Sequence, residues 1–218
     1  PTAGVLTMQS MLEEEGLKMS YERVRRLMRK ADIMPIYPRR TLTQRGENKY
    51  IQPYLLRDLK ITHPNHVWQI DITYIPMKNG FMYMTAIIDV YSRYIVGWGL
   101  SNSLDASESL KVLQQAVKIH GKPAIMNSDQ GSQFTCFEYI NYLKENDIKI
   151  SMDGKGRALD NIFIERFWRT LKYQYIYLNP KDNGLDLYLG IKQWIEKYHY
   201  KNHQGINNKP KNKYKKAA

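Results

Sequence analysis

Three consecutive segments with the pattern of β-strands limit most strongly how this chain can fold. They occupy residues 67–77, 81–92 and 93–101, and they are rich in β-branched and aromatic residues. Residues 78–80 read Lys-Asn-Gly, and an Asn-Gly pair between two strand patterns is a strong signal for a hairpin turn. The sequence therefore predicts an antiparallel meander of three strands.

Helical and strand patterns alternate after this meander. The expected elements are a helix at 105–120, a strand at 123–129, a helix at 135–145, a strand at 147–151, a helix from about 161 and a helix at 184–200. A meander followed by helical crossovers gives an α/β domain whose mixed five-stranded sheet is covered by helices. The first strand is expected to lie centrally, beside the fourth, which is the topology of a ribonuclease-H-like domain.

Two short helices are expected before the sheet, at residues 7–16 and 20–31. In the second helix, apolar residues recur at helical spacing, and Arg25, Arg26 and Arg29 occupy the other faces. This pattern predicts the second helix of a small DNA-binding module similar to a helix-turn-helix. An ordinary amphipathic surface helix has the same pattern, so both interpretations stay open.

Composition and charge divide the chain into four parts. We expect a helical module at 1–34, a proline-containing extended linker at 35–65, a catalytic core at 66–200 and a basic tail at 201–218. The net charge of the whole chain is +12. The first 62 residues carry 12 Lys and Arg against 7 Asp and Glu, and the last 53 carry 12 against 3. The middle carries 9 against 11, so basic flanks that could hold DNA surround an acidic centre.

Three acidic residues stand where the expected elements could bring them together. Asp71 lies inside the first strand, Asp129 ends the fourth strand, and Glu165 lies on the helix after a glycine-containing loop. Taken singly, each has an ordinary explanation: a solvent-facing strand residue, the start of a turn, and a solvated helix face with a Glu165–Arg169 ion pair. Together, clustered carboxylates repel one another unless they bind a cation, and oxygen ligands suit Mg²⁺ or Mn²⁺.

Five segments resemble sequence blocks of one family, in the same order: DITYI, IIDVYSRYIVGW, NSDQGSQF, DGKGRALDNIFIERFWRTLK and HQGIN. The chain resembles the insertion-sequence transposases whose catalytic domain is similar to retroviral integrase. In addition, 35 residues separate Asp129 from Glu165, the spacing that gives the Asp-Asp-35-Glu class its name.

The resemblance implies a DNA transposase that cleaves and joins the ends of an insertion sequence by phosphodiester transfer. Asp71, Asp129 and Glu165 would be its catalytic residues and the ligands of two Mg²⁺ ions, for which Mn²⁺ can substitute. The expected partners are element ends and target DNA, further copies of the chain assembled on DNA, and an upstream helix-turn-helix transposase product.

The polar face of the helix that carries Glu165 is expected to contact DNA. Lys172 matches a basic position that contacts element-end DNA in similar enzymes, and Asn161 and Arg166 match recurrent flanking positions. Arg169 lies on the same side of this helix and is included in the expected contact surface.

Two other functions fit the same residues: a hydrolytic nuclease of the same fold, and an inactive DNA-binding remnant of a transposase. The intact set of acids argues against a remnant, while Lys172 and the basic flanks argue against simple hydrolysis.

Cysteine content and hydropathy exclude several classes of protein. Cys136 is the only cysteine, which excludes a disulfide framework and a Cys-rich zinc site, so His63 and His66 are interpreted as linker residues. The sequence has no apolar run of about 18 residues, so no membrane partner is expected. These features predict an intracellular protein, and the resemblance to insertion-sequence transposases implies a bacterial cytoplasm and association with the nucleoid.

Overall fold

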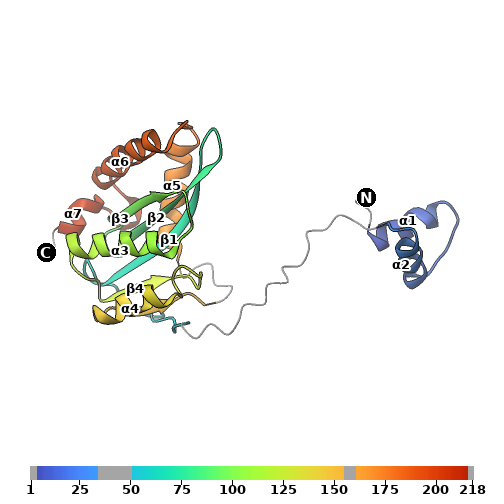
Figure 1. Cartoon of the computed structure of the whole chain (residues 1–218), viewed down its shortest axis with the longest axis horizontal. Coiled ribbons are helices and arrows are strands. Elements are labelled where there is room, and N and C mark those ends of the chain that lie inside the picture. Colours follow the sequence, from blue (N-terminus) through green and yellow to red (C-terminus); the bar gives the residue numbers. More distant parts are fainter. Residues whose placement is uncertain (1–3, 34–50, 155–160, 216–218) are drawn as a thin grey trace. The chain divides into compact units, whose positions relative to one another are not determined.

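The structure, a computed structural model, describes residues 4–33, 51–154 and 161–215 (Figure 1). The chain forms two compact units, Pro1–Glu47 and Asn48–Ala218. Residues 35–50, which make up the first half of the predicted linker, lie outside the described residues. No helix in the three described ranges has the length and apolar character needed to cross a membrane.

The N-terminal unit contains two helices, α1 (Val5–Glu14) and α2 (Tyr21–Lys30), as the sequence predicts to within two residues at each bound. Ser20 caps α2, since its side-chain oxygen accepts a hydrogen bond from the backbone N–H three residues on, at 3.4 Å. Val24 and Met28 lie one turn apart and are the buried residues of α2. Their burial leaves the arginines of α2 on its exposed surface.

A mixed five-stranded sheet forms the centre of the larger unit, in the order β3-β2-β1-β4-β5. The strands are β1 (Val67–Pro76), β2 (Phe81–Asp89), β3 (Ile95–Ser101), β4 (Ile125–Ser128) and β5 (Lys149–Met152). The pairs β1–β2 and β2–β3 are antiparallel, whereas β1–β4 and β4–β5 are parallel. The hairpin between β1 and β2 turns at Gly80, whose φ of 85° favours glycine. The predicted meander, crossovers and central first strand are confirmed.

Helices cover both faces of this sheet (Figure 1). One apolar cluster joins α3 (Ala106–His120) and α4 (Phe137–Glu145) to Trp68 and Ile70 of β1. A second cluster joins α5 (Ile162–Leu171), the π-helical turn η1 (Lys172–Ile176) and α6 (Gly184–Tyr200) to Ile75 of β1. Since successive strand residues point to opposite faces, odd-numbered residues of β1 face the side that α5 covers.

Two segments without a helix or strand pattern pack against the core. Leu55, in the predicted linker, donates its backbone N–H to Ser151 Oγ at 3.0 Å. In the predicted basic tail, a short 3-10 turn, η2 (Gln204–Ile206), precedes a helix, α7 (Pro210–Lys215). The hydroxyl of Tyr214 donates to Asn65 Oδ1 at 2.7 Å, which ties α7 to the segment before β1.

Candidate active site

Asp71 lies in the middle of β1 on the sheet face covered by α5, and its side chain is half-buried. Trp168, a buried residue of α5, donates its indole N–H to Asp71 Oδ2 at 2.9 Å. Burial raises the pKa of Asp71 to about 6, although the hydrogen bonds from Trp168 and from the backbone of Ile72 act in the opposite direction. The fold thus places an acid where a negative charge is poorly solvated and holds it with one directed donor.

Two other carboxylates raise the pKa of Asp71 further, those of Asp129 and Glu165. Strands β1 and β4 are parallel, and Gln69 pairs with Asn127. Asp71 and Asp129 each lie two residues after that pair, so they follow it in the same direction along the sheet. Glu165 is exposed on α5, the helix that also supplies Trp168. The charges of Asp129, after β4, and of Glu165, on α5, therefore both reach Asp71 on β1.

The geometry of Asp129 fits a tight turn as well as a carboxylate site. Its Oδ1 accepts the backbone N–H of Gly131 at 2.9 Å. A Cβ atom at Gly131 would stand 2.8 Å from the same oxygen, so only glycine lets the backbone approach the carboxylate this closely. The turn that sequence offered as the ordinary explanation is present, and it fixes the direction of the Asp129 side chain.

A neighbouring acid, Asp153, was not singled out from the sequence. It follows β5 and is buried, and its Oδ1 accepts Asn127 Nδ2 at 2.8 Å. Gln130 Nε2 donates to the backbone oxygen of Asp153, also at 2.8 Å. These bonds join the ends of β4 and β5 on both sides of Asp129.

The donor set is chemically suited to a hard divalent cation, since it consists of carboxylate oxygens. Among the residues that the structure describes, however, no three His, Cys, Asp or Glu side chains form a ready-made cation site. Repulsion between Asp71 and its two acidic neighbours is the feature that a bound cation would relieve.

The expected DNA-contact residues of α5 take different positions. Arg166 and Arg169 are exposed, and the alternative Glu165–Arg169 ion pair is not among the three ion pairs of the described residues. Lys172 is half-buried and donates to Thr73 Oγ1 of β1 at 2.7 Å. Asn161 is buried at the start of α5, so it does not share the exposed face with Arg166.

Comparison with known proteins supports both units. Residues 61–158 and 146–210 match the integrase core domain, and residues 1–41 match a helix-turn-helix-like domain, as predicted from α2.

The chain is 33% identical over 205 residues to the transposase for insertion sequence element IS904 of Lactococcus lactis, covering 90% of this chain and 79% of that protein. It is 34% identical over 192 residues to the InsK protein of insertion sequence element IS150 of Escherichia coli K12, covering 86% of this chain and 68% of that protein.

Among solved structures, the catalytic core domain of HTLV-2 integrase in complex with magnesium has a TM-score of 0.57 at 21% identity. The match covers 70% of this chain and 97% of that domain. At this identity the likeness shows a shared fold, the ribonuclease-H-like fold expected from the strand order.

Proposed function

The chain belongs to the insertion-sequence transposases with an integrase core domain, and we propose that Asp71, Asp129 and Glu165 are its catalytic residues. The observation that carries this assignment is that Asp71 is half-buried, held by the indole N–H of Trp168, and close enough to Asp129 and Glu165 for both charges to act on it. Such an arrangement destabilises the fold unless the charges serve a cation. A transposase needs this kind of site to cleave and join DNA strands.

The cation is proposed to be Mg²⁺, with Mn²⁺ as a substitute, because both prefer oxygen ligands. When bound, two such ions activate a hydroxyl nucleophile and stabilise the leaving oxygen at a phosphodiester. The chain's own residues do the positioning. Trp168 orients the Asp71 carboxylate through its indole N–H, and Gly131 orients that of Asp129 through its backbone N–H. Glu165 projects from α5, so its distance to the two aspartates depends on how that helix sits on the sheet.

DNA is proposed to contact two surfaces. Arg25, Arg26 and Arg29 on α2 form the contact surface of the helix-turn-helix-like unit, and all three are exposed. On the core, Arg166, Arg169 and Lys172 would hold DNA beside the carboxylates, since phosphate contacts fix register and orientation. Asn161, which was grouped with them from the sequence, is left out of this surface because its side chain is buried. We propose that copies of the chain assemble on the two element ends in the nucleoid, together with an upstream helix-turn-helix product where the element encodes one.

Asp129→Asn tests the assignment in the full chain, with a labelled element end and a supercoiled target plasmid in Mg²⁺. The variant should bind the end as well as wild type does, because one acidic charge has been removed, but it should neither nick nor join. Asp147→Asn is the matched control, since Asp147 pairs with Lys122 at an exposed site. Normal joining by Asp129→Asn would show the assignment to be wrong. Nicking without joining by wild type would favour the hydrolytic alternative.

A further inference from the structure

Arg93 is a half-buried cation at the turn after β2, outside the carboxylate site. Its guanidinium lies over the ring of Phe163 on α5, 3.6 Å from the ring centre. Its backbone has a φ of 63° and is held on both sides. Its backbone N–H donates to the backbone oxygen of Asp89 at 2.8 Å, and its backbone oxygen accepts a hydrogen bond from the hydroxyl of Tyr198 at 3.3 Å. The side chain is thus stacked on a ring and anchored at its root, so its position is well defined.

Two further cations stand near this guanidinium. The pKa of Arg93 is lowered to about 10, chiefly by burial; Tyr198 and Asp89 act in the opposite direction, and the positive charge of Arg166 adds to the lowering. Burial also lowers the pKa of Lys213, and there the charge of Arg93 adds to the effect. The ammonium of Lys213 lies 4.4 Å from the ring centre of Tyr91, beside the same turn. Arg93 and Lys213 line the same hollow, and the charge of Arg166 reaches Arg93. We call these three residues the Arg93 cluster (Arg93, Arg166 and Lys213).

The Arg93 cluster has no carboxylate partner in ion-pair contact among the described residues, because the three ion pairs found there involve other side chains. Asp89 is the acid whose charge reaches Arg93 and Lys213. Its carboxylate is buried and already accepts hydrogen bonds from Asn65 N at 2.7 Å, Ser92 N at 2.8 Å and Ser92 Oγ at 2.5 Å. Asp89 is one negative charge beside three cations, so the Arg93 cluster keeps an excess of positive charge. Such an excess is destabilising unless an anion occupies the site.

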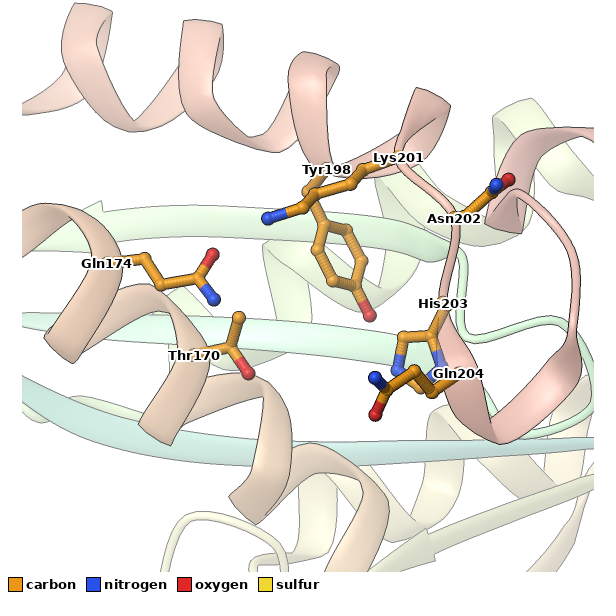
Figure 2. Close-up of a pocket in the computed structure, with 7 residues that line it drawn as sticks. All are labelled: Thr170, Gln174, Tyr198, Lys201, Asn202, His203 and Gln204. Atoms are coloured by element: carbon orange, nitrogen blue, oxygen red, sulfur yellow. The ribbon is translucent and has the colours of Figure 1, made fainter.

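The loop at residues 203–206 contributes to the lining of two hollows, and the first of them contains Arg93 and Lys213. The first, of about 250 Å³, is lined by Arg93, Phe163 and Lys213, with Gly205 and Ile206 at its edge. The second, of about 340 Å³, is lined by Thr170 of α5 and by Gln174, towards which the side chain of Lys201 extends, with His203 and Gln204 at one end (Figure 2). Thr170 is one turn beyond Arg166 and donates to its backbone oxygen at 2.8 Å. Arg166 therefore lies one helical turn from a residue that lines the second hollow.

We propose that Arg93, Arg166 and Lys213 form a binding site for a backbone phosphodiester of DNA, which adjoins the contact surface beside the three carboxylates and shares Arg166 with it. The inference rests on the proposed function, which makes DNA the substrate. A guanidinium whose face is fixed by an aromatic ring keeps its edge free for two parallel hydrogen bonds to phosphate oxygens. The polar lining of the second hollow suits the sugar and base next to that phosphate, because amide groups both donate and accept.

Lys213→Gln and Arg166→Gln test the site in the full chain, with binding of a labelled duplex measured over a range of salt concentrations in EDTA. Each variant should lower the slope of log affinity against log salt by about one, the counterion release of one phosphate contact. Lys118→Gln, which removes an exposed lysine from α3, should leave the slope unchanged. Unchanged slopes in both test variants would overturn the site. Because EDTA removes divalent cations, this result does not depend on whether Asp71, Asp129 and Glu165 are catalytic.

Arg93→Lys tests the role of the guanidinium in a variant that should still fold, because lysine keeps the positive charge and lacks only the planar group. Affinity for the duplex should fall severalfold with little change in the unfolding temperature, and equal affinity would contradict the role given to the stacked guanidinium.

A comparison with inorganic phosphate at matched ionic strength shows whether the site binds the DNA backbone or any free phosphate. Duplex DNA should raise the unfolding temperature of wild type more than that of Lys213→Gln, whereas phosphate should not discriminate. If phosphate stabilises wild type as selectively as DNA does, the site takes free anions and the assignment to the DNA backbone is refuted.

Discussion

Replacing Trp168 by Phe removes one N–H donor from Asp71 and keeps an aromatic ring in the buried cluster under α5. A hydrogen bond to a charged group contributes roughly 1.5–3 kcal/mol, and about 1.4 kcal/mol corresponds to a tenfold change in rate. If the indole holds Asp71 in the geometry of the reaction, Trp168→Phe should slow strand cleavage roughly 10- to 100-fold. The loss should appear in the rate at saturating DNA, since the indole N–H is directed at a carboxylate.

The assay is single-turnover cleavage of a labelled element end at saturating protein, with binding measured separately in EDTA. Trp194→Phe is the matched control, because Trp194 packs in the same cluster, 6.1 Å from the ring centre of Phe167. Both variants should bind DNA like wild type, and the control should cleave at close to the normal rate. Equal rates for Trp168→Phe and Trp194→Phe would refute the positioning role, because the lost packing would then explain both.

Two other tests address the N-terminal unit and the charge of Asp71. Removing residues 1–47 should leave a folded core with less discrimination between element-end and random duplexes in competition binding, because the exposed arginines of α2 are lost; undiminished discrimination would contradict this. Because burial raises the pKa of Asp71 from 3.8 to about 6, its contribution to stability is greatest below pH 3.8 and is lost as the pH rises through about 6. In metal-free buffer, Asp71→Asn should therefore raise the unfolding temperature at neutral pH more than at acidic pH, and an equal change at both would argue against the shifted pKa.

Local patterns predicted the sheet and its helices well because each element carries its own periodicity. The hairpin at Gly80 and the bounds of α6 follow from neighbouring residues. Helix α7 was not expected, since its attachment depends on a long-range contact from Tyr214 to Asn65. The same holds for Leu55, whose partner Ser151 lies 96 residues away. A polar, lysine-rich sequence carries no local signal for such contacts.

The polar face predicted from sequence for α5 is wrong at its first residue, Asn161. Asn161 was grouped with Glu165 at a spacing of one turn, but its φ of −115° and ψ of 23° are not helical, and its side chain is buried. At the other end of the helix, Lys172 lies on the side of the carboxylates, since its ammonium donates to Thr73 and the charge of Asp71 reaches it. The bond from Trp168 to Asp71 was not predicted, because periodicity cannot show where an indole N–H points.

Helix α5 carries opposite charges at two adjacent positions, and each belongs to a different group. Glu165 raises the pKa of Asp71, whereas Arg166 lowers that of Arg93. With 3.6 residues per turn, adjacent side chains point about 100° apart, so one helix can present its acid to the carboxylates and its cation to the Arg93 cluster. Carboxylates without a cation repel DNA, and nearby unpaired cations offset that repulsion. The Arg93 cluster should therefore contribute most to DNA binding before the divalent cation is bound, which is the condition that EDTA sets in the binding experiment.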